Sequence, residues 1–380
     1  MSTRTTSDGS VEIGSLFVPL DGTEWHERAI SYGLLISKWF GSTLDLFFSL
    51  ADVPPLTRHG EWRQRAHLSI DTAENTGNRD ASIVNNGAIH EFGKILANDY
   101  LNEITRRLEH FGVNTTTDLS AGSPAHILSY KAQQAGNSMI VMYARPQSRL
   151  RRYVRKKMAE ELMSVATVPV LMVNDAPDVD IRKIRFTPES VIVPLRVESA
   201  MRACLPYAIA IAKKNGVPIR IVESNIEYRR NRHEFDLARE HLSKALEESP
   251  VEHSFHASRL GITNSLSAAH KSSPYSWIVM GSRMRYGFTR NFWPSVSDNI
   301  RREVSCPVLA VPHAELIPKR EARLRRWIDD WLAHQDVSSV LAAEATDQAS
   351  RRGWTQKVMS VYTFDDRDRT GSGRPPQWRT

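Results

Sequence analysis

Short apolar segments alternate along the chain with longer segments in which apolar residues recur every three or four positions. Residues 16–20 (LFVPL) and 191–195 (VIVPL) are apolar throughout and bounded by polar residues, which is typical of strands buried on both faces. Each is followed by a segment, 29–37 or 205–212, whose small and apolar residues share one helical stripe. This alternation predicts βαβ units and therefore a parallel sheet.

Two copies of one sequence pattern organise the chain. Three pairs of segments match in the same order: 16–47 with 191–222, 140–142 (IVM) with 278–280, and 169–173 (PVLMV) with 307–311 (PVLAV). The offset is 175 for the first pair and 138 for the other two, so the first copy has 37 more residues before its IVM segment. Residues 51–90 contain several prolines and glycines and few periodic apolar positions, and we expect a long loop there.

Both copies also predict the same helix ends and a closing strand. Gly41 and Gly216 mark the ends of the first helices, because glycine adopts the left-handed cap conformation without a side-chain penalty. A second helix is expected over about 89–110 in the first copy and 233–248 in the second. The last strand of each copy starts with a proline, a position that loses no important ladder hydrogen bond.

Composition and charge exclude several classes of protein. The 380 residues are 41% hydrophobic and 24% charged, as in ordinary folded proteins. No apolar run approaches the roughly 20 residues of a membrane span, and the first ten residues are polar without a secretion signal, so we expect a cytoplasmic protein. Cys204 and Cys306 belong to no metal-binding or redox motif. The net charge of +7 favours attraction of anions but does not establish nucleic-acid binding.

Together, these segments resemble the universal stress protein family in tandem form. The resemblance covers residues 14–312, and the residues that carry it are VPLDGT at 18–23, the two IVM segments, VPVLMV at 168–173 and CPVLAVP at 306–312. It implies an α/β fold with two tandem doubly wound domains, each with a five-stranded parallel sheet. This fold is flavodoxin-like or Rossmann-like, as in adenine nucleotide hydrolases, with ligands at the carboxyl ends of the strands. The family also implies a role in stress adaptation by binding and regulation rather than turnover.

The resemblance also suggests a domain organisation and an internal contact. We expect a disordered N-terminus (1–12), a first domain (13–175), a second domain (186–313), an amphipathic helix (315–334) and a largely disordered tail (335–380). Family members commonly pair through their last strand, so strands 169–173 and 307–311 should join the two domains as an internal pseudo-dimer. Whether two whole chains also form a homodimer stays open.

In members of the family that bind ATP, two features stand out: an Asp after the first strand and a loop of the form G-x2-G-x9-G-[S/T] after the IVM strand. Glycines let backbone amides approach phosphate oxygens, and the Asp can contact the nucleoside. The first copy keeps the acidic residue as Asp21. Its loop keeps none of the four signature residues, which are replaced by Tyr143, Pro146, Lys156 and Lys157.

The second copy keeps a different fragment of the same pattern. Gly281 and Ser295 remain, but Met284 and Pro294 replace the other two glycines, and Arg196 stands at the Asp position. Proline removes an amide donor, and each charge-assisted hydrogen bond that is lost weakens anion binding by roughly 1.5 to 3 kcal/mol. These departures predict weak or lost ATP binding, so ATP is a cofactor candidate without being an established one.

A run of cations in the first copy offers a compensating anion site. It consists of Arg145, Arg149, Arg151, Arg152, Arg155, Lys156 and Lys157, with no acidic residue among them. Arginine forks can hold phosphates bidentately, so a nucleotide, a polyphosphate or an RNA could bind there, as could an acidic protein. The alternative is a solvated basic face. The candidate ligand-binding residues are therefore Asp21, Gly281, Ser295, Arg196, Arg145, Arg149, Lys156 and Lys157.

Three functional hypotheses follow from these candidates. The first is a non-catalytic regulator, and the second is an ATP-binding protein with slow hydrolysis at Gly281 and Ser295. The third is an interaction protein whose basic loop, 145–157, binds an acidic partner or RNA. No HExxH or GxSxG motif points to an enzyme or a metal site, and five histidines are expected at the surface: His233, His241, His253, His256 and His270.

The amphipathic helix predicted at 315–334 lies outside the repeat. Its apolar stripe comprises Leu324, Trp327, Ile328, Trp331 and Leu332. We expect the stripe to dock on the second domain of its own chain, with a partner protein or a membrane surface as the alternative.

Overall fold

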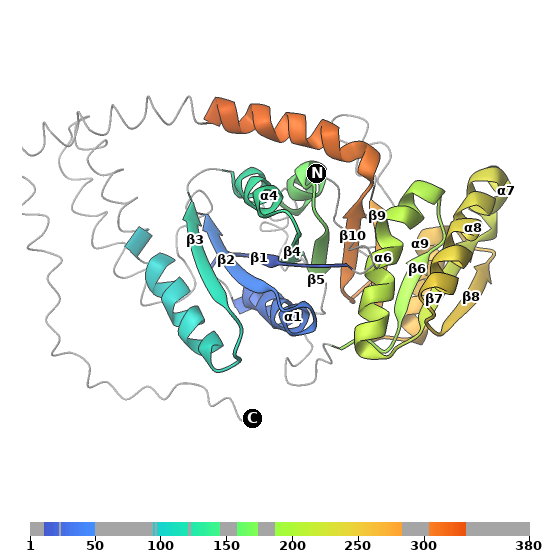
Figure 1. Cartoon of the computed structure of the whole chain (residues 1–380), viewed down its shortest axis with the longest axis horizontal. Coiled ribbons are helices and arrows are strands. Elements are labelled where there is room, and N and C mark those ends of the chain that lie inside the picture. Colours follow the sequence, from blue (N-terminus) through green and yellow to red (C-terminus); the bar gives the residue numbers. More distant parts are fainter. Residues whose placement is uncertain are drawn as a thin grey trace, which may run out of the picture. The chain divides into compact units, whose positions relative to one another are not determined.

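The structure is a computed structural model that describes residues 11–22, 24–49, 94–95, 97–120, 123–144, 158–173, 187–282 and 304–331 (Figure 1). The first half contains β1 (Ser15–Leu20), α1 (Glu24–Phe40), β2 (Thr43–Ser49), a helix described over 94–95 and 97–109, β3 (Thr115–Ser120), α4 (Pro124–Ala135), β4 (Ser138–Tyr143), a helix described over 158–165, and β5 (Val170–Val173).

The second half repeats this order. It contains β6 (Val191–Pro194), α6 (Glu198–Asn215), β7 (Ile219–Ser224), α7 (Asn225–Arg230), α8 (Arg232–Glu248), β8 (His253–Ser258), α9 (Ile262–Ser272), β9 (Trp277–Ser282), β10 (Val308–Pro312), a short 3-10 helix (Ala314–Leu316) and a helix described over 317–331.

The described strands form one sheet in the order β3-β2-β1-β4-β5-β10-β9-β6-β7-β8. Neighbouring strands are parallel within each half, whereas β5 and β10 are antiparallel, with Leu171 opposite Leu309. This arrangement confirms two doubly wound, five-stranded α/β units. It also confirms the predicted pairing of segments 169–173 and 307–311, in which each strand covers an edge that the other would leave open.

The two faces of the sheet are buried in two separate clusters, because successive residues of a strand point to opposite faces. In β1, Leu16 and Val18 belong to one cluster, and Phe17 between them belongs to the other. Helices α1, α6 and α8 and the helix at 97–109 complete the first cluster, while α4, α9 and the helix at 158–165 complete the second. Burial on both faces explains why the central strands are apolar throughout.

The predicted helix ends are confirmed. Gly41 and Gly216 have φ of +70° and +62°, the left-handed conformation that ends a helix without strain only for glycine. Helix α8 matches the segment predicted over 233–248, and the described helical residues 97–109 fall within the segment predicted over 89–110.

An aromatic cluster joins the two halves beside the central strands. Trp277, the first residue of β9, is only 2% exposed. Its ring centroid lies 5.8 Å from that of Tyr32 and 5.4 Å from that of Trp39, both on α1 of the first half. Nearby, the Lys214 ammonium of α6 lies 5.8 Å from the centroid of the Phe40 ring. The halves are therefore joined by side-chain packing as well as by the β5–β10 ladder.

The terminal helix over 317–331 is amphipathic as predicted, but among the described residues its side-chain contacts are with the first half, where docking on the second half was expected. Leu324 and Ile328 are buried, and Arg320 donates a hydrogen bond from Nη1 to the carbonyl of Ala166 at 2.6 Å. The helix follows β10, which lies next to β5, so the helices of the first half are within its reach (orange in Figure 1). Ala166 follows the helix at 158–165, where carbonyl groups lack partners within the helix and accept from arginine.

Several predicted segments lie outside the described residues. They are the N-terminal residues 1–10, the long loop at 51–90, Leu332 of the terminal helix, and the tail at 335–380. Among the described helices, none combines the length and the apolar character that a membrane span needs.

Candidate functional site

The strand order reverses between β1 and β4 in the first half and between β6 and β9 in the second. In open α/β sheets, ligands bind outside the carboxyl ends of the strands at such switch points. Asp21 directly follows β1, and Arg196 comes soon after β6, while Gly281 is the penultimate residue of β9. The structure therefore places Asp21 at the first switch point and brings Arg196 and Gly281 to the second.

Neighbouring side chains hold Asp21 at the first switch point. Its Oδ1 atom lies 3.2 Å from His26 Nδ1, and the two side chains are 14% and 8% exposed. The His26 ring lies 6.4 Å from the ring of Tyr143, at the end of β4. Tyr143 occupies the position of the first loop glycine and is itself buried. Where a glycine would let the backbone approach a phosphate, this position therefore has a packed aromatic side chain.

A second acidic residue of α1, Glu27, is also engaged by neighbouring side chains. The Tyr100 hydroxyl donates to Glu27 Oε1 at 3.3 Å, and Arg107 Nη2 lies 3.5 Å from Glu27 Oε2. Burial raises the pKa of Tyr100 well above its ordinary value, and the charges of Glu27 and Asp21 raise it further. Tyr100 thus stays protonated and continues to donate to Glu27.

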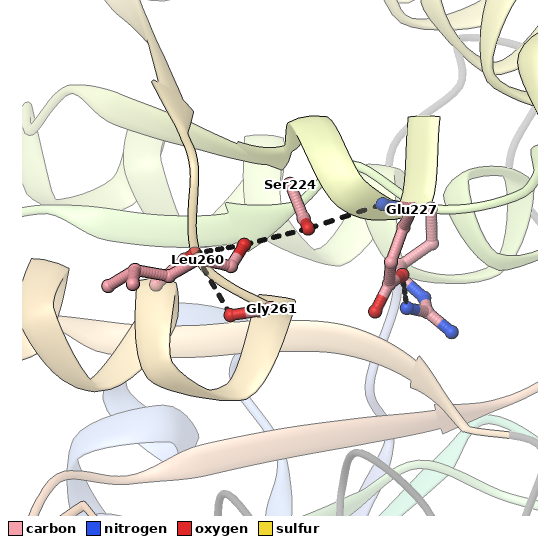
Figure 2. A network of polar contacts seen from close by, with 6 residues as sticks. Ser224, Glu227, Leu260 and Gly261 are labelled. Carbon is pink, nitrogen blue, oxygen red and sulfur yellow. Dashed lines mark hydrogen bonds and ion pairs between the residues drawn. The ribbon is translucent and has the colours of Figure 1, made fainter. Parts of the chain in front are cut away.

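The second switch point carries the opposite charge, which is also engaged. Arg196 pairs with Glu227 on α7. Ser224, at the end of β7, accepts a hydrogen bond from the Glu227 amide at 3.4 Å and donates one to the Leu260 carbonyl at 2.8 Å (Figure 2). This network ties the strand ends of β6, β7 and β8 together. A phosphate could recruit Arg196 only by competing with the carboxylate of Glu227.

Gly281 has a packing role that is independent of any ligand. A Cβ atom at this position would lie 2.7 Å from Ala200 Cα and 2.8 Å from the Ala200 carbonyl oxygen. Contacts this short are forbidden by sterics, so helix α6 can approach β9 only over a glycine. The buried Cys204 lies nearby, and burial raises its thiol pKa to about 12, which keeps the sulfur protonated and unreactive.

Two groups of Ser, His and Glu occur among the described residues: Ser199–His313–Glu315 and Ser123–His126–Glu161. In both groups the hydroxyl and the carboxylate approach the same ring nitrogen, Nδ1. The distances are 3.2 and 3.7 Å in the first group and 3.0 and 3.3 Å in the second. A catalytic triad needs the serine at one ring nitrogen and the acid at the other. Neither arrangement therefore activates its serine as a nucleophile.

His126 instead forms part of the surface on which the terminal helix packs. Its ring stacks on Trp327 with a centroid distance of 4.5 Å and an interplanar angle of 17°. Burial, and secondarily the positive charge of Arg323 on the terminal helix, lower the pKa of His126 from 6.5 to about 4. The Glu161 carboxylate favours the protonated ring, but these two effects outweigh it. His126 is therefore neutral in the folded protein at physiological pH.

We expect the docked helix to make stability sensitive to acid. The folded protein holds the pKa of His126 below its unfolded value, so this contribution is complete above pH 6.5 and is lost as the pH falls toward 4. Between pH 7 and pH 5 the loss amounts to about 2 kcal/mol of unfolding free energy. Urea unfolding of the wild type and of His126→Phe, which keeps a ring on Trp327, measures it. An identical pH dependence in both proteins would contradict this assignment.

The remaining sequence-predicted candidates, Ser295, Arg145, Arg149, Lys156 and Lys157, lie outside the described residues. Two described groups were missed by the sequence analysis. His26 gives no motif, whereas Ser224 and Glu227 have the S-x-x-E spacing of a capping box, which could have indicated both α7 and its acidic residue. His270, predicted at the surface, is buried with 8% exposure, because it lies on the inner face of α9. The described residues contain no group of His, Cys, Asp and Glu that could hold a metal.

The comparison with family models gives a match in both halves. The universal stress protein family model matches residues 13–174 and, a second time, residues 189–312. In a search by sequence, none of the curated proteins matches the chain.

Solved structures of similar fold span both halves. A universal stress protein from Archaeoglobus fulgidus aligns with a TM-score of 0.56 at 15% identity, covering 80% of this chain and 98% of that one. A putative universal stress protein from Pseudomonas aeruginosa aligns with a TM-score of 0.52 at 14% identity, covering 84% of this chain and 100% of that one. At these identities the likeness concerns the fold.

Proposed function

The chain belongs to the universal stress protein family, and on this premise we propose that it is a non-catalytic regulator in stress adaptation that binds ATP weakly or not at all. The observation that carries the proposal is the ion pair between Arg196 and Glu227. Arg196 stands where ATP-binding members have an acidic residue that contacts the nucleoside, so the charge at this position is reversed. The pairing with Glu227 also means that the protein's own side chains occupy the position.

The first half supports the same proposal by a different route. Asp21 is present, but His26 lies against it, and Tyr143 replaces the glycine from which the phosphate loop would start. Glu27 is likewise engaged by Tyr100 and Arg107, so the acidic groups of this switch point are held by the protein's own side chains. Each half therefore combines one retained family residue with neighbours that disfavour the ligand.

The described residues offer little support for the hydrolytic alternative. Gly281 is required by the approach of Ala200, so its retention is explained without a nucleotide. The two Ser–His–Glu groups lack the geometry of an activated nucleophile. A regulator that acts through its surfaces accounts for these features better than an enzyme does.

Calorimetric titration with ATP and Mg²⁺ tests the proposal. We expect a Kd weaker than about 100 µM, which corresponds to a binding free energy smaller than about 5.5 kcal/mol. Low-micromolar binding with one nucleotide per chain would refute it.

A pair of variants tests the reason for the weak binding. Glu227→Gln removes the carboxylate that engages Arg196 and should bind ATP more tightly than the wild type. Glu234→Gln removes an exposed carboxylate from α8 and should leave the affinity unchanged. Equal effects of the two substitutions would show that general charge, and not the pairing of Arg196, controls the affinity.

A further inference from the structure

We propose that the second half binds the phosphate backbone of single-stranded nucleic acid at the junction of α7 and α8. The surface consists of Arg229, Arg230, Arg232 and Arg259, and it is called the α7–α8 corner below. None of these arginines is among the nucleotide-site candidates, so the proposal does not depend on whether ATP binds.

Paired charges hold the corner in place. Arg239 on α8 donates from Nη2 to both carboxylate oxygens of Glu223 at 2.7 Å, and its guanidinium lies 4.7 Å from the centroid of the Tyr228 ring. Arg239 also lies 3.7 Å from Asp236. Glu227, also on α7, pairs with Arg196. Glu223 and Glu227 are therefore each paired with an arginine that serves the fold, whereas Asp236 shares Arg239 with Glu223.

The four arginines of the corner serve no comparable role. Arg229, Arg230 and Arg232 fall within four consecutive positions, and all four side chains are exposed. None of them makes an ion pair with any residue that the structure describes. The Ser224 hydroxyl binds the Leu260 carbonyl and thereby ties the start of α7 to the loop that carries Arg259 (Figure 2). Glu234 and Asp236 are exposed acidic residues at the start of α8, and the four arginines outnumber them, so the corner keeps a net positive charge.

Exposed apolar side chains next to the corner favour nucleic acid over an acidic protein. Phe255 on β8 is 53% exposed, and Leu260 and Ile226 are 49% and 42% exposed. Strand β8 is at the end of the sheet, with one edge unpaired among the described strands. Unstacked bases pack on aromatic and apolar side chains while arginines follow the backbone, a combination that an acidic peptide would not use.

The test is fluorescence anisotropy of the full chain with a labelled 12-nucleotide oligouridylate, measured at several salt concentrations. The triple variant Arg229→Ala, Arg230→Ala, Arg232→Ala should bind at least about tenfold more weakly. The slope of log K against log salt should become shallower by about 2, because each phosphate contact on a single strand contributes about 0.7. Phe255→Ala should weaken binding severalfold and leave the salt slope unchanged, since stacking releases no counterions.

A matched control removes the same number of positive charges near the opposite ends of the strands. Lys213, Lys244 and Lys271 are exposed residues toward the C-terminal ends of α6, α8 and α9, where helices return to the starts of the strands. Their triple replacement by alanine should leave RNA affinity within about twofold of the wild type. Absence of RNA binding, equal losses in both triple variants, or polyglutamate binding that matches RNA binding would each overturn the proposal. Thermal unfolding of every variant verifies that the fold is retained.

Discussion

Replacing Trp277 with alanine should lower the free energy of unfolding by about 3 to 5 kcal/mol, the usual cost of truncating a fully buried large aromatic residue. Trp277 belongs to the second half, but its ring packs against Tyr32 and Trp39 of the first. The substitution should therefore weaken the contact between the two halves, and the unfolding transition should become less cooperative. Urea unfolding followed by circular dichroism measures both the free energy and the steepness of the transition.

Two further substitutions separate the effect at the junction from the general cost of losing an indole. Trp277→Phe keeps a ring beside Tyr32 and should retain most of the stability. Trp331→Ala removes a partly buried indole that stacks only on Trp327 among the described rings, and it should cost about 1 kcal/mol. If Trp277→Ala cost no more than Trp331→Ala, the aromatic cluster would not be what joins the halves.

Gly281→Ala should destabilise the protein by about 3 kcal/mol, at the upper end of the cost of overpacking a core by one methyl group. The new Cβ would meet Ala200 Cα at 2.7 Å and its carbonyl oxygen at 2.8 Å, and backbone atoms cannot rotate away. Helix α6 would have to move off β9, which carries strain into the Arg196 end of the helix. Chemical unfolding provides the measurement.

Two controls identify the cause of that loss. Ala200→Gly removes a methyl group that would lie 2.8 Å from the new Cβ, so the double variant should regain only part of the stability. Gly33→Ala in α1 would place a Cβ 2.8 Å from Leu44 Cδ1, the movable end of a side chain. Its cost should stay below about 1 kcal/mol, because alanine also favours the helix by about that amount over glycine. A neutral Gly281→Ala would contradict the packing role of this glycine.

The central strands of the fold could be predicted because they have strong sequence signals. Central strands buried on both faces are continuous apolar runs, and their recurrence at constant offsets indicated the duplication. The edge strands β3 and β8 were not located in advance, since their residues, TTTDLS and HSFHAS, are mostly polar and only partly buried or exposed. Their strand conformation depends on pairing with β2 and β7, which local patterning does not reveal.

The terminal helix shows a different limit of sequence reasoning. The spacing of Leu324 and Ile328 predicted its buried stripe, but periodicity carries no information about the surface that receives it. The stripe packs on the first half because β10 pairs with β5. The contacts between the helix and this half, such as Trp327 on His126, join residues about 200 positions apart. Only the assembled sheet brings these residues together.

The candidate site was predictable in its position but not in its contacts. The family resemblance located Asp21, Arg196 and Gly281 near the strand ends, where the structure has them. It did not indicate that His26 and Glu227 would engage the two charged residues, or that Ala200 would explain the retained glycine. His26 and Ala200 lie on α1 and α6, the helices that follow β1 and β6, whereas Glu227 lies on α7, which follows β7. None of these three side chains matches a family motif.

The central claim is that the protein's own side chains occupy both positions where a nucleotide would bind. Native mass spectrometry of the freshly purified full chain tests it most directly. The account predicts an intact mass equal to that of the polypeptide alone, unchanged after brief incubation with micromolar ATP and Mg²⁺. A mass increase equal to one or two nucleotides, persisting through purification, would contradict it.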